Sequence, residues 1–440
     1  MATESHQPAP RPIPQHLPFL TLVLLLLIAL HAFHGPVRSW FSGRYRAETQ
    51  FRRALDICLD EYVDPRAPAE LIHGAIEGMV EALKDRHSAF LTPTVHQRLR
   101  EHEEGRYAGL GINIDLTRDE RLVITRVFDD SPALAAGLRP GDIILWAAEH
   151  DPDGLKQPAK TDLTTVRDIT RVSAVLRGKV GSKVTLGIRR KKTPADLAKA
   201  GLKESAGALK GNATEDLEIT VVRAEIRPPL VEVKLLPDRI GYLRIINDFP
   251  DDATRKVRKG LEEVVAQGAK ALVLDLRGNQ GGFLDEAIRI ADLFVRDGVI
   301  VSTKNRYESE NRVFQASPGG PGEDLPMAVL VDAGSASAAE ILAGTLQDHG
   351  RAKLVGTKTY GKGAVSKRFP LGDGSGILLS TGRYILPKGR TIEGIGLEPD
   401  LVVHYPSLDE LRSLPPEAPR PDPQLDAAVK LLKDQLTTTK

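Results

Sequence analysis

Cysteine is almost absent from this sequence, since Cys58 is the only one in 440 residues. A lone cysteine excludes an intramolecular disulfide, and because Cys58 stands in a helical-looking stretch we expect it to be a core residue. The eleven histidines form neither an HExxH motif nor a cluster with cysteine. Those patterns are the ones that hold zinc, so the sequence predicts no bound metal and no cofactor.

An excess of charge of one sign is also lacking. Lysine and arginine number 60 against 59 aspartates and glutamates, which gives a formal net charge of +1. This balance offers no electrostatic reason to expect a nucleic-acid partner. The hydrophobic content of 41% is ordinary for a globular protein. The length leaves room for about two to four domains.

A single long apolar run stands out, from residue 17 to residue 33. Its seventeen residues are at the short limit for a membrane-spanning helix and exceed the usual apolar run of a signal peptide. No small-x-small cleavage site follows, because Leu30 stands two places before Ala32. We therefore expect residues 1–40 to form a cytoplasmic tail and an inner-membrane anchor, with a cleaved signal peptide as the alternative. In both cases the rest of the chain is exported, which predicts a place in the cell envelope.

The next region, residues 41–104, has the apolar spacing of helices. Between residues 51 and 99 apolar side chains recur every three or four positions, with a break at Asp64-Pro65. This pattern predicts two or three amphipathic helices. We interpret them as a packing or dimerisation element.

From residue 105 to 225 the period changes from helix to strand. Residues 110–115 and 122–127 alternate, a short helix follows Ser131-Pro132, and a helix is predicted over 165–176. Strands 183–189 and 217–222 would form a hairpin, interrupted by an insertion near 191–215. This order resembles a circularly permuted PDZ domain of bacterial proteases. The resemblance implies a carboxylate-binding loop formed by Tyr107, Ala108, Gly109, Leu110, Gly111 and Ile112, where glycines let backbone N–H groups converge.

Strands alternate with helices in the third region, residues 226–405. Strands are predicted over 240–245, 271–276, 327–331 and 353–355, and helices over 253–267, 284–295 and 338–347. Small residues fill the turns between them at 277–282 and 332–337. The sequence thus predicts a layered α/β core whose functional site lies at these turns. Residues 406–440 form a tail and a final helix.

Two serines compete for a chemical role in the second turn. Ser337 precedes an apolar helix, and Glu340 stands three places later, which is the pattern of a capping box and therefore of a purely structural N-cap. The same position puts a nucleophile beside unpaired N–H groups and the positive end of a helix dipole, which stabilise an oxyanion. Ser335 is equally placed in the turn, so these residues alone leave both candidates open.

Lys362 follows a glycine-rich turn that nearly matches a phosphate-binding loop. Gly356 and Gly361-Lys362 have the right spacing, but Gly363 replaces the Ser or Thr that would bind Mg²⁺, and no helix is predicted to follow. We interpret the lysine as an enclosed base. Burial would have to lower its pKa from about 10.4 towards roughly 7–8 for it to accept a serine proton.

Motifs along residues 51–403 resemble the carboxyl-terminal processing (tail-specific) serine proteases. The matching runs are Tyr62-Val63-Asp64, Gly78-Met79, His87-Ser88, Asp275-Leu276-Arg277-Gly278-Asn279, Gly281-Gly282, Gly334-Ser335-Ala336-Ser337-Ala338, Glu340-Ile341, Tyr360-Gly361-Lys362-Gly363, Gly394-Ile395-Gly396-Leu397-Glu398-Pro399-Asp400 and Asp422-Pro423-Gln424-Leu425. In that family the second serine is the nucleophile and its lysine lies 25 positions later. The spacing selects Ser337 and Lys362.

The resemblance implies further features of fold, site and partners. It implies a multidomain mixed α/β protein with a crotonase-like protease core, and an oxyanion hole from the N–H groups of Gly281, Gly282 and Ala338. It also implies that the PDZ domain captures apolar carboxyl termini of protein substrates and gates the site through Arg177. A homodimer and an adaptor or activator belong to the same expectation.

The sequence departs from the family pattern at three places, of which one, Ala339 in place of a common serine, we expect not to touch the chemistry. Ser366 replaces the glutamine that usually hydrogen-bonds the lysine as third member of the catalytic group, and a hydroxyl has a shorter reach. The run Lys84-Asp85-Arg86 replaces the usual Leu-Asp-Pro, and we expect it to lie away from the chemistry. The change at Ser366 leaves a second hypothesis open, a catalytically silent, membrane-tethered PDZ scaffold.

Overall fold

The computed structural model describes residues 43–117, 121–151, 159–166, 168–192, 214–407, 410 and 421–438. They belong to two compact units, of which the first ends at Lys84 and the second begins at Asp85. The expected anchor at 17–33 lies outside the described residues, as does most of the insertion near 191–215. Of the helices that the described ranges contain, none is long and apolar enough to cross a membrane.

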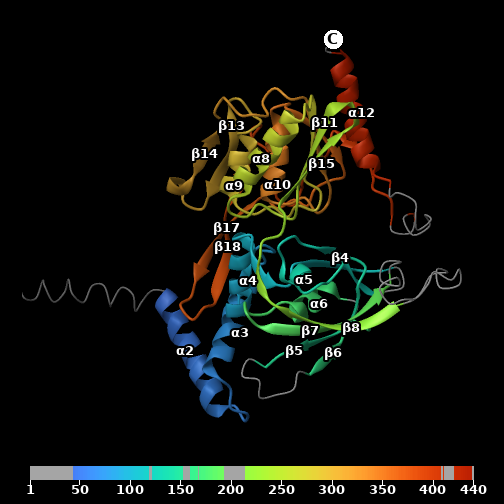
Figure 1. Ribbon diagram of the computed structural model, residues 1–440. Helices are drawn as coiled ribbons and strands as arrows, with labels where there is room; N and C mark the ends of the chain where they lie inside the picture. Colours follow the sequence, from blue (N-terminus) through green and yellow to red (C-terminus); the bar gives the residue numbers. More distant parts are fainter. Residues whose placement is uncertain are drawn as a thin grey trace, which may run out of the picture. The chain divides into compact units, whose positions relative to one another are not determined.

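The described part of the first unit, residues 43–84, contains two helices. α2 (Gly43–Glu61) and α3 (Pro68–Glu81) contact each other and are separated at Asp64-Pro65, as the sequence predicts. They are drawn in blue in Figure 1. No residue of α2 is buried, and Cys58 is exposed. The prediction that Cys58 is a core residue was therefore wrong.

The main sheet of the second unit has six strands in the order β10-β11-β12-β15-β16-β19. They are β10 (Val231–Leu236), β11 (Ile240–Ile245), β12 (Ala271–Asp275), β15 (Met327–Val331), β16 (Ala352–Gly356) and β19 (Leu401–Val402). β10 is antiparallel to β11, and the other neighbours are parallel. The strands predicted from buried apolar runs are confirmed, and their carboxyl ends meet at one edge of the sheet.

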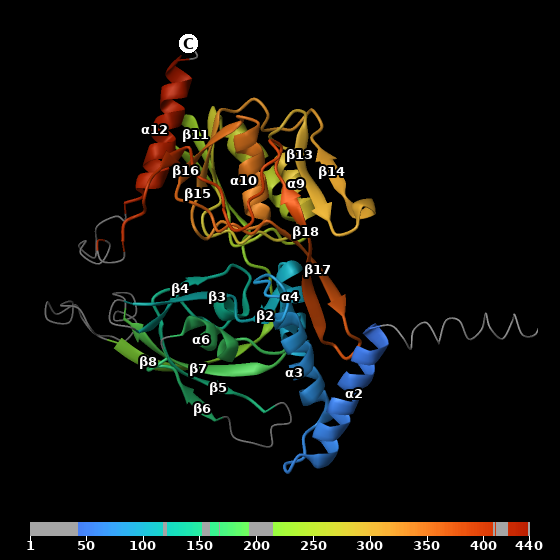
Figure 2. The ribbon, with the colours of Figure 1, turned by 180° about the vertical axis from the view of Figure 1, so that it is seen from behind.

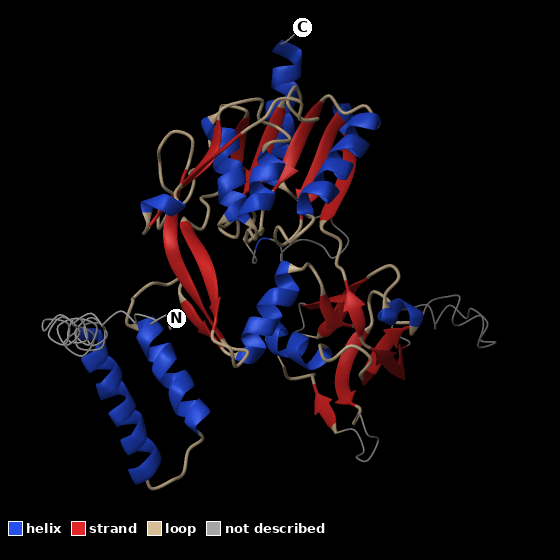
Figure 3. Ribbon diagram, turned by 90° about the vertical axis from the view of Figure 1, so that its left-hand side faces the viewer, coloured by secondary structure: helices blue, strands red, loops and turns tan. Residues whose placement is uncertain are grey.

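Helices cover both faces of this sheet. They are α8 (Ala253–Ala266), α9 (Leu284–Ala291), α10 (Ala338–Asp348) and α12 (Pro423–Thr438). Alternate residues of β12 face opposite layers: Leu272 and Leu274 join the core under α8, α9 and α10, while Ala271 and Val273 pack with α12. The helical layers and the sheet can be followed in Figures 1 and 3. The mixed, layered α/β core is thus observed.

A second sheet extends from this core. It has the order β1-β18-β13-β14, with β17 paired to β18. Its strands are β1 (Ala89–Leu91), β13 (Val299–Asn305), β14 (Arg312–Gln315), β17 (Ala364–Pro370) and β18 (Gly376–Ile385). Helix α4 (Pro93–Glu103) follows β1, and β17 and β18 form the long hairpin labelled in Figure 2. The start of β17 directly follows the loop that carries Lys362.

The segment from 107 to 226 builds a smaller sheet with its own apolar core. The order is β3-β4-β5-β7-β8, with β6 paired to β5, and β2 and β9 pair in a separate two-stranded sheet. The elements are β2 (Tyr107–Gly109), β3 (Ile112–Leu116), β4 (Leu122–Val127), α5 (Pro132–Ala135), β5 (Ile143–Glu149), β6 (Lys160–Asp162), α6 (Ile169–Leu176), β7 (Lys183–Lys191), β8 (Thr214–Val222) and β9 (Ala224–Ile226). The predicted hairpin is confirmed as β7 and β8. The helix predicted over 165–176 is shorter.

Candidate active site

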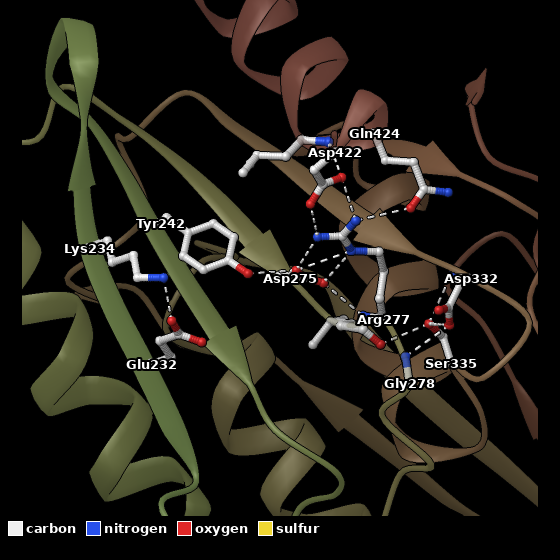
Figure 4. Close-up of polar contacts among 12 residues, drawn as sticks. Glu232, Lys234, Tyr242, Asp275, Arg277, Gly278, Asp332, Ser335, Asp422 and Gln424 are labelled. Carbon is white, nitrogen blue, oxygen red and sulfur yellow. Dashed lines mark hydrogen bonds and ion pairs between the residues drawn. The ribbon is translucent and has the colours of Figure 1, made fainter. Parts of the chain in front are cut away.

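The turn after β15 carries both candidate serines, and the structure separates their roles. Ser335 is fully buried, its hydroxyl donates to the Leu276 carbonyl at 2.8 Å, and its oxygen accepts the Asp332 N–H at 3.0 Å. Figure 4 shows Ser335 beside Asp332, in the turn that follows β15. These bonds tie the turn to β12. Ser335 therefore holds the turn in place, and its hydroxyl is occupied.

Ser337 has an unusual backbone for a residue at the start of a helix. Its φ of 54° and ψ of −118° lie outside the extended region that N-cap residues normally adopt. A non-glycine residue at positive φ is strained, and such strain persists where the surrounding structure enforces it. The predicted capping contact is present, since the Ser337 N–H donates to Glu340 Oε2 at 2.9 Å. Ordinary capping does not require the strained conformation, which therefore points to a further role.

Glu340 connects the two predicted catalytic residues. Its side chain is fully buried, and Oε2 accepts the N–H of Ser337 and the N–H of Lys362, at 2.9 and 2.8 Å. Oε1 accepts the Thr359 hydroxyl at 2.5 Å and the Gly361 N–H at 2.8 Å. One carboxylate thus fixes the serine turn and the lysine loop against each other. The sequence indicated Glu340 only as a helix-capping partner.

Lys362 lies in the loop between β16 and β17 and is half-buried. Burial lowers the pKa of its amine, while the nearby charge of Glu393 opposes this and raises it. Gly361 has a φ of 87°, and a Cβ there would lie 2.8 Å from the Gly396 nitrogen. A strand follows the lysine instead of a helix, which agrees with the rejection of a phosphate-binding loop. On balance the environment lowers the pKa of the Lys362 amine below its ordinary value.

The predicted oxyanion turn lies against the serine. Gly281 has a φ of 98°, and a Cβ built on it would lie 2.7 Å from the Ala338 nitrogen and 2.8 Å from the Ser337 Cβ. A Cβ built on Gly282, which has a φ of 133°, would lie 2.4 Å from the Phe249 oxygen. The Gly281 N–H donates to Asn279 Oδ1 at 3.0 Å. Of the predicted donors, Gly281 thus packs against Ser337 and Ala338, whereas Gly282 packs against Phe249, and the Gly281 N–H is already engaged.

A buried ion network anchors the start of the oxyanion turn (Figure 4). Asp275 is fully buried and accepts hydrogen bonds from the Tyr242 hydroxyl at 2.8 Å and from Arg277 Nη2 at 2.7 Å. Arg277 also donates to Asp422 Oδ1 at 2.8 Å and to Gln424 Oε1 at 3.1 Å. Burial works against the charge of Arg277, but its bonds to the two aspartates raise its pKa overall. Asp422 and Gln424, from the motif at residues 422–425, therefore fix the end of β12 through Arg277.

Ser366 lies on β17 opposite Ser380. Its Oγ is buried and has no hydrogen-bond partner in the part of the chain that the structure describes. The hydroxyl therefore does not replace the glutamine as a hydrogen-bonding neighbour of Lys362 in this conformation.

Arg86 contradicts the expectation that its segment lies away from the chemistry. Arg86 Nη2 donates to the Gly361 carbonyl at 2.7 Å, next to the predicted base. The spacing of motifs could not reveal this contact, because it joins residues 275 positions apart.

The smaller sheet contains a groove of about 400 Å³ between β3 and α6. Five of the six predicted loop residues line it, namely Tyr107, Gly109, Leu110, Gly111 and Ile112, whereas Ala108 lines a separate hollow. Arg177 also lines the groove, and its guanidinium carbon lies 4.5 Å from the centre of the Tyr107 ring. Among the described strands, β3 is at the edge of its sheet, facing this groove.

The chain is similar in sequence and fold to known proteins. The profile of peptidase family S41 matches residues 239–403, which contain Ser337, Glu340 and Lys362. A carboxy-terminal-processing protease of Bartonella bacilliformis is 31% identical over 427 residues, covering 89% of this chain and 90% of the relative. This chain belongs to peptidase family S41, the carboxy-terminal-processing proteases. It is a serine protease and therefore a hydrolase.

Two further relatives fit this assignment. A probable CtpA-like serine protease of Staphylococcus aureus is 30% identical over 357 residues, which span 81% of this chain and 64% of the relative. The structure of a putative S41 protease from Bacteroides fragilis matches with a TM-score of 0.53 at 18% identity, covering 86% of this chain and 93% of the other. That likeness supports the multidomain mixed α/β fold of this family member.

Proposed function

We propose that this S41 protease is an endopeptidase that uses Ser337 as nucleophile and Lys362 as general base to cleave exported proteins near their carboxyl ends. The observation that carries the proposal is the buried Glu340 carboxylate, whose Oε2 accepts the backbone N–H of both residues. The strained backbone of Ser337 and the lowered pKa of Lys362 support the same assignment.

The chemistry follows from these groups. Neutral Lys362 accepts the hydroxyl proton as Ser337 Oγ attacks a substrate carbonyl, and the resulting ammonium protonates the leaving amine. The Ala338 N–H, at the start of α10, stabilises the oxyanion together with the glycine turn. Gly281 can contribute only if its N–H exchanges Asn279 for the oxyanion, so we assign the main share to Gly282 and Ala338. Water then hydrolyses the acyl-enzyme, and no step needs a metal or a nucleotide.

We assign residues 105–225 as the permuted PDZ domain. Its groove would select substrates by their carboxyl ends. The Leu110 carbonyl accepts the Ala133 N–H and the Gly111 carbonyl accepts the Phe128 N–H. In a trans peptide unit the next N–H points the opposite way, so the N–H groups of Gly111 and Ile112 are directed away from these partners. A terminal carboxylate can bind them, and an extended peptide can add to the edge of β3. Arg177, stacked on Tyr107, is the residue we propose to gate activity.

The remaining features of the proposal concern assembly and location. The domains run over 1–40, 41–104, 105–225, 226–405 and 406–440, with a crotonase-like protease core as the fourth. We propose an anchor at 17–33 that holds the catalytic part outside the cytoplasm, and association into a homodimer with an adaptor or activator.

A cleavage assay tests the catalytic assignment. The full-length protein is incubated with an unstructured protein that has an apolar carboxyl end, beside the Ser337→Ala, Lys362→Ala and Ser335→Ala variants. We expect cleavage to be lost in the first two, by about 10⁴-fold or more, and to persist in the third if it folds. Cleavage by Lys362→Ala at the parental rate would refute the dyad. Absence of both cleavage and labelling of Ser337 by a fluorophosphonate in the parent would favour the PDZ scaffold.

A further inference from the structure

Arg86 holds the amino-terminal side of the loop that carries Lys362. Besides its bond to the Gly361 carbonyl, its guanidinium carbon lies 5.4 Å from the centre of the Tyr360 ring. The segment that presents Arg86 is itself fixed, because Asp85 accepts the His87 N–H at 3.2 Å and the Ser88 hydroxyl at 2.5 Å. Half of the Arg86 side chain is exposed, yet its polar end reaches the residue before Lys362.

Glu393 holds the other side of the same loop. Its Oε2 accepts the Gly363 N–H at 2.9 Å, and its Oε1 lies 3.0 Å from His87 Nε2 and 3.7 Å from Arg86 Nη2. His87 Nε2 also lies 3.1 Å from Arg86 Nε, and one ring nitrogen cannot donate to Glu393 and accept from Arg86 at once. We assign the hydrogen to the contact with Glu393, because a carboxylate only accepts.

We propose that Arg86, His87 and Glu393 are positioning residues for Lys362, and that Arg86 offsets the negative charge that Glu393 places beside the lysine amine. The cluster binds the peptide groups on both sides of Lys362, so it fixes the direction in which the lysine side chain leaves the loop. This inference rests on the proposed role of Lys362 as the base.

The charges around the lysine loop determine whether each variant raises or lowers the pKa of Lys362. Glu393 favours the ammonium form of Lys362, and Glu340 contacts its backbone N–H from α10. Arg86 and, when protonated, His87 place positive charge beside Glu393 and weaken its influence on the amine. Because half of Arg86 is exposed, solvent and salt screen its charge, and we expect shifts of about half a pH unit.

The pH profile of kcat/KM tests the inference, with the full-length protein and its Arg86→Met, Arg86→Lys and Glu393→Gln variants. Arg86→Met should move the acidic limb to higher pH by about half a unit, which is about threefold less activity on that limb. Glu393→Gln should move it to lower pH, since glutamine keeps the shape and a Gly363 acceptor but removes the charge. Arg86→Lys keeps the positive charge, so its acidic limb should lie at the same pH as in the parent. Arg306→Met is the matched control, because Arg306 also lies over a tyrosine, 6.0 Å from the ring centre of Tyr307.

The outcomes separate this inference from the catalytic assignment. Suppose that the acidic limb stays in place in both Arg86→Met and Glu393→Gln, while Lys362→Ala is inactive. That result would overturn the positioning role and would leave the Ser337–Lys362 dyad standing. Parental activity in Lys362→Ala would overturn the dyad itself. If Arg86→Met fails to fold, the direction of the Glu393→Gln shift decides, because that variant is nearly isosteric: a shift to lower pH supports the inference and any other result contradicts it.

Discussion

The serine side and the lysine side of the candidate site are held by different kinds of contact. Ser337 is fixed by residues of its own turn and of the neighbouring strand end, such as Ser335, whose hydroxyl bonds to Leu276. Lys362 is fixed through its two neighbours, because Arg86 binds Gly361, 275 positions away along the chain, and Glu393 binds Gly363. Only Glu340 contacts the backbone of both among the described side chains.

The two sides should therefore differ in how strongly substitutions affect activity. On the serine side the residues are buried, the Ser337 backbone is strained and backbone atoms lie close together, so a small change there should abolish function. On the lysine side Arg86 is half-exposed and Glu393 is partly exposed. Charges in such places are screened, so changes there should adjust the rate and its pH dependence.

The most damaging small change to the serine side is Gly281→Ala. Gly281 has a φ of 98°, and its new methyl group would lie 2.7 Å from the Ala336 oxygen and from the Ala338 nitrogen. Neither backbone atom can move without displacing Ser337. We expect kcat/KM to fall by about 10³-fold, as when an oxyanion-hole donor is lost. Gly268→Ala, also at positive φ but with open space around it, is the control. Parental activity in Gly281→Ala would remove this turn from the site.

Removal of the Arg277 side chain should break the support behind the serine side. Arg277→Ala leaves the fully buried Asp275 without its ion partner, and we expect the free energy of unfolding to fall by about 3 kcal/mol. Chemical denaturation measures it. Arg255→Ala removes an arginine whose side chain is 75% exposed and whose partner, Asp252, is 35% exposed, so it should cost far less. Equal losses would contradict the anchoring role of the network.

Glu340→Gln should uncouple the two halves. An amide presents an NH₂ group to one pair of donors, so two of the four donors that bond to Glu340 lose their acceptor, at an expected cost of about 1–3 kcal/mol each. We expect kcat/KM to fall by about 10²-fold. Denaturation and activity are measured on the same samples, with Glu262→Gln on the exposed face of α8 as control. Normal activity in Glu340→Gln would show that catalysis does not need the link that Glu340 makes between Ser337 and Lys362.

Ser366→Ala should have the smallest effect, in contrast to what the family pattern suggests. Its Oγ is buried and unpartnered in the described structure, so its removal breaks no hydrogen bond. We expect kcat/KM to change by less than about twofold. A large loss would mean that the hydroxyl contacts Lys362 in the reacting conformation.

The sequence predicted the local parts of this site well and the distant parts poorly. Strands such as 240–245 and 327–331 were found because a short, mostly apolar run between polar, turn-forming residues specifies a buried strand. Ser337 and Lys362 were selected as catalytic candidates through motif spacing, and their roles stay a prediction. The contacts of Arg86 and the bond between Arg277 and Asp422 were missed, because no local pattern encodes which remote residues meet.

Two local predictions failed for physical reasons as well. The helix predicted from residue 165 begins at Ile169, because residues 164 and 165 form a turn in which the Thr164 N–H bonds to Asp162. Cys58 was expected to be buried, but α2 buries no residue. Amphipathic spacing predicts a helix without telling what covers its apolar side.

The most direct test of the central claim is the rate at which a fluorophosphonate labels Ser337, measured against pH in the parent and in Lys362→Ala. If neutral Lys362 is the base, labelling of the parent should rise with pH through one ionisation below the ordinary lysine value, because burial lowers that pKa. In Lys362→Ala it should be at least about 10²-fold slower and should lack this ionisation. A variant that labels at the parental rate with the parental pH profile would contradict the Ser–Lys mechanism.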